Sequence, residues 1–401
     1  MTEFWLISVP LDKASSQSLE KLKRAAAKAS LGSSVRFHIP ELKVGTLDVL
    51  LGVADDLSRL DSYAECVMQK TSQCMAEVME QSNDKLLENA LANGEHKGYR
   101  KAPQSPLKVY FQALWVDLAT YVTKFQWDRA KYPTALSLKS LTEIITKQVS
   151  QVETELKSRS AAYSSVKASL QGLEQRSEGN LQTRTLTGIV KKEDLVLNSE
   201  YLTTLLVVVP RASDKLWENT YESMSQFVVP RSSRKLLEEA DAGIFTVTLF
   251  KNAVREFKAK ANKHKFTVRE FNLEEAEQQR QEMSRLSLDK KELYGTFVRW
   301  LKVNFREVFV AWIHIKALRV FAESVLRYGL PVSFQTLLLQ PEKKHMKRLR
   351  EELHSLFTHL DPTAAASKSD MDLDIPGCNT GQQEYYSYIC YSISIKLLDS
   401  S

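Results

Sequence analysis

The sequence predicts a mixed, helix-rich α+β fold with the outline of an elongated dumbbell. Two stretches, Leu138–Leu173 and Leu273–Tyr328, carry apolar residues three and four positions apart, which is the spacing of one helical face. Between them the composition changes to short β-branched runs, which predicts a compact α/β layer. Because the two helical stretches enclose this layer in sequence, we expect them to run antiparallel and lead the chain out and back.

This arrangement divides the chain into a foot, a neck and a head. We expect a foot domain built from both ends of the chain, a neck of two antiparallel helices, an inserted α/β head and a loop insert within the foot. The foot comprises residues 1–135 and 326–401, the neck residues 136–178 and 273–325, the head residues 179–272, and the insert residues 95–115. The second neck helix is expected to continue into the core of the foot.

The amino-terminal part of the foot is expected to contain strands and long helices. In chain order the predicted elements are a strand at Phe4–Val9, a helix at Ser15–Ala29, a strand at Val35–Ile39 and, from Leu47 to about Asn93, one long helix or two abutting ones. Pro10 and Pro40 close the two strands, because proline cannot donate a backbone hydrogen bond. Thr46 is a suitable cap for the long helix. The segment that follows, Glu95–Pro106, is basic, contains glycine and proline and lacks periodicity, which predicts a surface loop or a disordered insert.

The head is expected to place two helices on one sheet. Its predicted elements are strands at Leu205–Val209, Phe227–Val229, Ile244–Phe250 and Phe266–Phe271, and helices at Asp214–Ser225 and Lys251–Asn262. The order strand, helix, strand, strand, helix, strand is typical of a compact α/β layer.

The carboxy-terminal part of the chain returns to the foot. From about Val308 the second long helix is apolar nearly all round, which is typical of an element buried on several sides. Gly295 is the position where we expect any bend in this helix. After Pro331 the sequence predicts a strand at Phe334–Leu339, a basic helix at Lys343–Leu360 and a last strand at Tyr385–Leu397. We expect the last strand to pair with Phe4–Val9.

Composition and charge restrict the class of protein. The chain has 55 Lys and Arg against 49 Asp and Glu, and the two signs are interspersed, so the sequence does not predict a nucleic-acid-binding protein. No apolar run approaches the ~20 residues of a membrane span. The four cysteines form no CxxC pair and are typical of free thiols in a reducing compartment. We therefore expect a cytosolic protein that reaches membranes only through partners.

The sequence contains no recognisable catalytic, cofactor-binding or metal-binding pattern. Neither of the glycine-rich phosphate-binding patterns is present, and the scattered histidines lack the HExxH spacing. His314 lies in the most apolar part of the second long helix, which favours a hydrogen-bonded core histidine over a metal ligand. No cofactor is expected.

Two clusters of basic residues are the candidate partner-binding sites. The first consists of Lys258, Lys260, Lys263 and Lys265 in the head, and the second of Lys343, Lys344, Lys347 and Arg348, followed by Arg350, in the foot. Each cluster is either ordinary solvated surface or a docking surface for acidic protein partners. Their separation along the predicted dumbbell suits a brace between two partners better than an active site.

A resemblance to a known family extends over nearly the whole chain. The segments that carry it include EFWLISVP at Glu3–Pro10, FQWDRAKYP at Phe125–Pro133, SEYLTTLLVVVP at Ser199–Pro210, FVVPRSS at Phe227–Ser233 and VRWLKVNFREVFVAWIHIKALRVFAESVLRYGLPV at Val298–Val332. Together they are similar to the C subunit of the vacuolar-type (V-type) proton ATPase. One departure is the insert Glu95–Trp115, where the family pattern runs almost directly from Gly94 to Val116.

The resemblance implies a function without catalysis. It implies a foot, neck and head, in agreement with the division above, and a stator role at the junction of the V1 and Vo sectors. The head would hold a peripheral stalk of the E and G subunits, and the foot would meet another stalk and the N-terminal domain of the a subunit. It also implies reversible release from the complex, support of organelle acidification, binding of actin filaments, and a cytoplasmic location on endomembranes or the plasma membrane through the complex.

Two other functions fit the sequence. The helical stretches and basic clusters also fit a cytoskeletal, actin-binding coiled-coil scaffold protein. An enzyme with an unrecognised site in the α/β layer is a third alternative, because a fold alone does not exclude activity.

Overall fold

The chain divides into two compact units. The computed structural model describes residues 3–11, 20, 24, 32–92, 106–331, 333–360 and 386–395, without the side chains of residues 81–92, 106–112, 115 and 359. Unit 1 comprises Met1–Arg159 and Phe297–Ser401, and unit 2 comprises Ser160–Thr296. Each unit combines helices with a four-stranded antiparallel sheet, which confirms the predicted α+β class. The finer division into foot, neck and head stays a prediction.

The sheet of unit 1 joins the two ends of the chain. It is formed by β1 (Glu3–Pro10), β2 (Gly32–Arg36), β7 (Phe334–Pro341) and β8 (Ile389–Ser394), in the order β2-β7-β1-β8. The central strand β1 pairs with β7 on one side and with β8 on the other, with Leu6 opposite Leu338 and Tyr391. This confirms the predicted pairing of the first and last strands, although β8 is shorter than Tyr385–Leu397.

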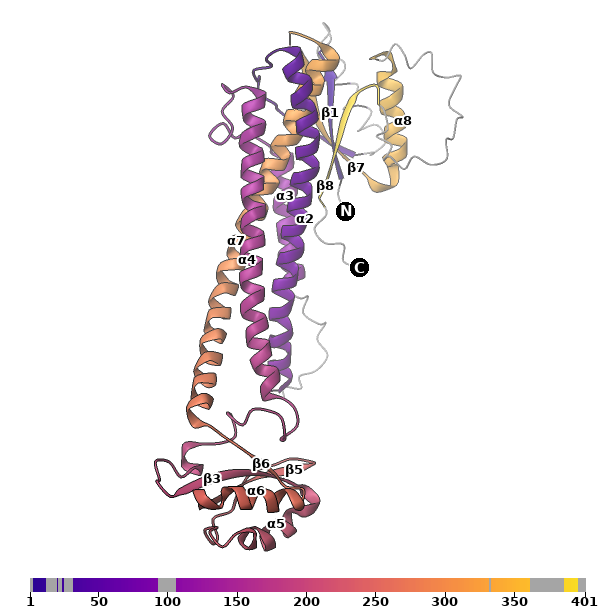
Figure 1. Cartoon of the computed structure of the whole chain (residues 1–401). Helices are drawn as coiled ribbons and strands as arrows, with labels where there is room; N and C mark the ends of the chain where they lie inside the picture. The colour runs from indigo at the N-terminus through magenta and orange to yellow at the C-terminus, as the bar shows by residue number, and fades with distance from the viewer. Residues whose placement is uncertain are drawn as a thin grey trace, which may run out of the picture. The chain divides into compact units, whose positions relative to one another are not determined.

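The two faces of this sheet bury alternate side chains of β1. Trp5 and Ile7 pack with Leu349 and Leu353 of helix α8 (Met346–Phe357), whose apolar side chains recur at helical spacing. Figure 1 shows α8 on one side of β1, β7 and β8. On the other face, the hydroxyl of Ser8 lies 2.7 Å from that of Ser324 in the long helix α7.

Helix α7 (Leu273–Tyr328) supplies the main core of unit 1. Phe309, Ile313 and Leu318 are fully buried. Around this stretch the chain places α2 (Leu47–Ala92), α3 (Pro106–Thr123) and α4 (Leu138–Ser177), all of which are labelled in Figure 1. The long helices at Leu47, Leu138 and Leu273 are confirmed.

Two predictions for the amino-terminal region need correction. The strand expected at Val35–Ile39 begins earlier, at Gly32, and ends at Arg36. Phe37 still donates its N–H to Thr336 of β7 at 3.2 Å, and its ring stacks on Phe125 at 4.3 Å. The loop insert expected at residues 95–115 is helical from Pro106 onward, where α3 begins. Proline is favoured in the first turn of a helix, and the apolar residues that follow it continue the helix. The helix expected at Ser15–Ala29 lies mostly outside the described residues.

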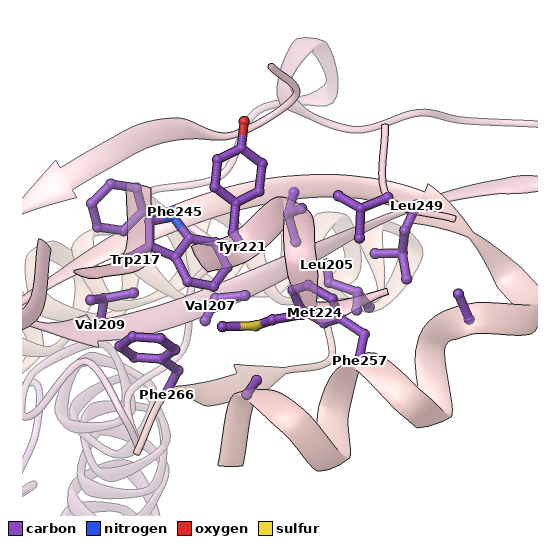
Figure 2. Close-up of a cluster of buried hydrophobic side chains, with 14 residues drawn as sticks. Leu205, Val207, Val209, Trp217, Tyr221, Met224, Phe245, Leu249, Phe257 and Phe266 are labelled. Atoms are coloured by element: carbon purple, nitrogen blue, oxygen red, sulfur yellow. The ribbon is translucent and has the colours of Figure 1, made fainter. Parts of the chain in front are cut away.

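The sheet of unit 2 carries two helices on one face. Its strands are β3 (Leu202–Pro210), β4 (Arg234–Glu238), β5 (Ala242–Phe250) and β6 (Thr267–Arg269), in the order β4-β5-β3-β6, and its helices are α5 (Asp214–Thr220) and α6 (Val254–Lys263). Figure 2 shows Trp217 at the centre of the core between helices and sheet. Its indole is fully buried and donates a hydrogen bond of 2.9 Å to the hydroxyl of Ser233.

The second strand of unit 2 differs from the prediction. Residues 227–229 form only an isolated bridge between Val228 and Leu249, because Pro230 and the left-handed turn at Arg231 (φ 58°) end the pairing. The strand that completes the sheet is β4, which the sequence did not predict. It has a register irregularity between Lys235 and Leu237, which breaks the alternation of an ordinary strand.

Short 3-10 turns connect several elements. They are η1 (Lys192–Asp194), η2 (Arg211–Ser213), η3 (Tyr221–Met224), η4 (Lys251–Ala253), η5 (Lys343–His345) and η6 (Thr358–Leu360).

Two glycines, one inside α7 and one just after it, allow a test of helix energetics. Gly295 lies inside the helix, and a Cβ added there meets nothing within 4 Å. Gly329 follows the helix at φ +80° and donates its N–H to Val325 at 2.9 Å. Gly295→Ala should raise the free energy of unfolding by about 1 kcal/mol, because alanine favours a helix interior. Gly329→Ala should lower it by about 1 kcal/mol, because the left-handed conformation strains a Cβ.

Chemical denaturation of both variants, followed by circular dichroism, checks this prediction. Each variant replaces one glycine by the same residue, so each is the control of the other. Equal changes of the same sign in the free energy of unfolding of the two variants would contradict the prediction. The expectation that Gly295→Ala also stiffens the neck stays a prediction, tested by the domain orientation of the variant.

Candidate interaction surfaces

A metal-binding cluster and a membrane-spanning helix are both absent from the described residues. Over that part of the chain, no group of three or more His, Cys, Asp and Glu side chains is placed to hold a metal ion. None of the helices in the same residues has the length and apolar character needed to cross a bilayer. The two basic clusters singled out by the sequence are therefore the first candidates, and they differ in how far their charges are neutralised.

The head cluster is partly neutralised by its own neighbours. Lys258 on α6 forms an ion pair with Glu270, and Lys260 forms one with Glu256 at 2.7 Å. Glu256 also accepts a hydrogen bond of 3.1 Å from Ser225. The bond from Lys260 is the main reason why the pKa of Glu256 is lowered. Exposed ion pairs of this kind contribute little to stability, but they occupy the two lysines.

The other two lysines of this cluster lie at the end of α6. Lys263 and Lys265 are exposed, and neither forms an ion pair with any residue that the structure describes. Lys265 adopts a left-handed conformation (φ 61°), and the next residue, Phe266, donates its N–H back to Ala261 at 3.0 Å. The turn that ends the helix thus fixes the backbone from which Lys265 extends.

The second cluster presents its charges without internal partners. Lys343 and Lys344 lie on η5, and Lys347 and Arg348 on the first turn of α8; all four are unpaired among the described residues. The neighbouring Arg350 behaves differently, because its guanidinium lies 5.1 Å from the centre of the Trp5 ring. The basic residues of η5 and α8 are therefore less neutralised by ion pairs than Lys258 and Lys260.

A third surface, in unit 2, was not predicted from the sequence. Five large apolar side chains are exposed there by 40% or more: Val196, Leu197, Tyr201, Phe227 and Phe250. The rings of Phe227 and Phe250 meet edge to face at 6.1 Å, and the backbone N–H of Lys251 donates to the carbonyl of Tyr201 at 2.8 Å. Contiguous exposed aromatic residues are a recognised mark of a binding surface. The only sequence signal was the position of Phe250 at the end of the predicted strand Ile244–Phe250.

A buried ionic cluster in unit 1 has a structural role. Asp61 of α2 accepts hydrogen bonds from the Trp312 indole at 2.7 Å and from Lys316 at 2.9 Å, and it also pairs with Arg319. The side chains of Asp61 and Lys316 are only 4% and 8% exposed, so no substrate reaches this carboxylate. The cluster joins α2 to α7.

His314 is a core histidine, as the sequence predicted. Its Nε2 accepts the backbone N–H of Asp128 at 3.1 Å, and its Nδ1 lies 2.8 Å from the carbonyl of Val310, to which it donates. Phe125, Trp127 and Tyr132 surround the ring. Burial lowers the pKa of His314 to about 4, so the imidazole is neutral in the folded protein near pH 7. Both ring nitrogens are occupied, which leaves none for a metal.

Comparison with known proteins gives a full-length match. The family model described as the V-ATPase C subunit matches residues 4–389. The C 1-A subunit of the V-type proton ATPase of Danio rerio is 54% identical over 402 aligned residues, which cover 100% of both chains. The C 1 subunit of the V-type proton ATPase of Rattus norvegicus is also 54% identical, with 100% of both chains covered. A solved cytoplasmic N-terminal domain of the V-ATPase I subunit, which is a homologue of the a subunit, reaches a TM-score of only 0.29 at 9% identity over 88% of this chain and 96% of that one.

The neutral state of His314 predicts a dependence of stability on pH. The unfolded chain takes up a proton at His314 below its ordinary pKa of about 6.5, whereas the folded chain does so only near 4. Stability is therefore greatest above pH 6.5 and falls as the pH drops from 6.5 to 4, by about 3 kcal/mol from this group.

Denaturant titrations across this pH range check the prediction. His314→Gln should be less stable than wild type at pH 7. Its free energy of unfolding should, however, lose most of its dependence on pH between pH 6.5 and 4. His354→Gln, on the exposed face of α8, is the matched control and should keep the wild-type slope. An unchanged slope in His314→Gln would rule out His314 as its source.

Proposed function

The chain belongs to the V-ATPase C subunit family, and on this basis we propose that it is a non-catalytic peripheral-stalk component of the V1 sector of the proton-pumping ATPase. In this role it bridges E–G stalks and the a subunit. It also controls the reversible assembly of V1 with Vo and thereby supports organelle acidification. The observation that carries the proposal is the match to the family and to its curated members over the full length of both chains.

The structure supports a bracing role through its separate cores and its surfaces. Unit 1 and unit 2 each have their own buried core, so each can serve as a separate attachment point. We propose that the head, residues 179–272, holds an E–G stalk. We propose that the foot, residues 1–135 and 326–401, contacts another stalk and the N-terminal domain of the a subunit, with residues 136–178 and 273–325 as the neck.

The basic clusters are the proposed electrostatic contacts. The surface of η5 and α8 offers Lys343, Lys344, Lys347 and Arg348 to an acidic surface of the a subunit, since none of the four has a described ion-pair partner. In the head, Lys263 and Lys265 offer free charge, while Lys258 and Lys260 contribute only if their own ion pairs open. Actin filaments are a second proposed partner, drawn from the family resemblance.

The proposed location follows from the complex. The protein is cytoplasmic and associates peripherally with endomembranes or the plasma membrane through the other subunits, without inserting into the bilayer. The cytoskeletal scaffold function gains no support from the comparisons, because the family model and the curated relatives both point to the ATPase. An enzyme activity of the α/β layer is likewise not proposed.

Binding experiments with purified partners test the proposed function. The full chain should bind an E–G heterodimer and, separately, the N-terminal domain of the a subunit, and should hydrolyse no ATP. Reversing the charges of Lys343, Lys344, Lys347 and Arg348 to Glu should raise the Kd for the a subunit by about tenfold or more, because four like charges steer the encounter.

The same variant should retain its affinity for the E–G heterodimer. The matched control reverses Lys258, Lys260, Lys263 and Lys265 and should leave the affinity for the a subunit unchanged. A wild-type chain that binds neither partner would refute the proposed function.

A further inference from the structure

A polar cavity lies in unit 1 beside strand β8. It is bounded by α2, by α7, and by β8 with the residues that lead into it, Tyr386 and Tyr388. These elements are far apart in sequence, and Figure 1 shows β8 next to α2. The cavity has a volume of about 270 Å³. Pockets for drug-sized ligands measure about 300–1,000 Å³, so this cavity suits a smaller molecule.

Arg319 brings a surplus positive charge to the wall of this cavity. Lys316 and Arg319 both pair with the carboxylate of Asp61, and the side chain of Arg319 is only 13% exposed. One carboxylate neutralises only one of the two cations, so the cluster as a whole keeps one positive charge. A charge that is buried without a partner is strongly unfavourable. Arg319 is the member of the cluster that lines the cavity, so a bound anionic group can reach the surplus charge there.

The guanidinium group of Arg319 has hydrogen-bond donors to spare. Besides its pair with Asp61, it makes one long hydrogen bond, of 3.4 Å, to the hydroxyl of Ser58. A guanidinium group has five N–H donors in a planar fork, so most of these donors have no acceptor among the described residues. The ring of Tyr391 lies 4.3 Å from the group and holds its plane in place. A fixed fork with unused donors is well suited to binding a carboxylate.

An unmatched negative charge lines the same cavity. Asp55 of α2 is exposed at the cavity and forms no ion pair with any residue that the structure describes. The other two charged side chains of the lining, Glu323 and Arg327, neutralise each other at 2.7 Å. Arg327 also donates to the carbonyl of Tyr386 at 3.0 Å. The unmatched charges of the cavity are therefore one positive, at Arg319, and one negative, at Asp55, on two different helices.

These two unmatched charges identify the class of ligand. A simple anion would pair with Arg319 but would meet the like charge of Asp55, and a simple cation would meet the reverse arrangement. A small zwitterion provides a partner for each charge, because it carries both a carboxylate and an ammonium group. An α-amino acid is a zwitterion of suitable size. Its side chain can lie against Tyr386 and Tyr388, whose rings stack at 5.4 Å in the wall of the cavity.

We propose that the cavity between α2, α7 and β8 binds a free α-amino acid. The carboxylate of the ligand accepts hydrogen bonds from Arg319 and Ser58, and its ammonium group pairs with Asp55. The bound ligand thereby connects two helices with the last strand of the chain. The site uses only residues of unit 1 and is independent of the proposed role in the ATPase.

Calorimetric titration of the purified full chain tests this inference with four probes. L-Alanine and L-phenylalanine are the zwitterions. 3-Phenylpropionate lacks the ammonium group of phenylalanine, and phenethylamine lacks its carboxylate. At least one amino acid should bind at one site per chain. The two analogues should bind about tenfold or more weakly than L-phenylalanine, because each leaves one charge of the site without a partner.

Variants assign each charged group of the ligand to its partner. Asp55→Asn should raise the Kd for the amino acid about tenfold without weakening the binding of 3-phenylpropionate. Arg319→Lys keeps a positive charge but removes the planar fork, so it should weaken both ligands about tenfold. Asp56→Asn is the matched control, because it removes the same charge from the next residue of α2, which lines a different groove beside α4. This control should bind like wild type.

Circular dichroism checks that each variant is folded. Asp55→Asn keeps the test decisive if Arg319→Lys does not fold, because Asp55 is exposed and holds no described partner. Failure of both amino acids to bind the wild-type chain overturns the inference. Binding of 3-phenylpropionate as tight as that of L-phenylalanine, or binding of the amino acid that Asp55→Asn leaves unchanged, overturns it as well. All of these outcomes leave the proposed function in place, since that function is tested by the binding of other subunits.

Discussion

The structure of unit 1 depends on the burial of one helix from all sides. From Val308 to Val325 nearly every side chain of α7 is buried, so no single neighbour can cover it. The chain meets this constraint by surrounding α7 with elements that are far apart in sequence. Phe309 contacts Tyr121 of α3, Trp312 bonds to Asp61 of α2, and Ser324 meets Ser8 of β1. The sheet that joins the two chain ends thus forms part of the cover of α7.

Buried polar groups fix how α7 lies against this cover. Hydrophobic burial is not directional, so apolar packing alone tolerates small shifts of a long helix. Asp61, by contrast, pairs with Lys316 and Arg319 on successive turns, and His314 bonds to the backbone at Asp128. Loss of one partner in such a cluster would leave an uncompensated buried charge, which is strongly unfavourable. These groups therefore select one register of α7 against the elements that surround it.

The sequence predicted the elements that a local pattern identifies. It missed features that depend on contacts between residues far apart in the chain. The long helices, β1, β5 and the pairing of β8 with β1 follow from periodicity and apolar runs. Strand β4 did not, because its edge position and irregular register leave no alternation to recognise. His314 was assigned to the core because its neighbours along the helix are apolar. The partners of Asp61 lie more than 250 residues away, and Phe227 and Phe250 resemble core residues until their pairing places them at the uncovered end of a sheet.

Charge and apolar surface are distributed differently over the two units. The basic residues of η5 and α8 have no exposed aromatic residue beside them among the described residues, and screening by salt readily weakens a contact made by such charges alone. Unit 2 instead exposes the paired rings of Phe227 and Phe250, and a contact made by desolvated rings is insensitive to screening. A contact made through the first surface would therefore respond to ionic strength more strongly than a contact made through the second.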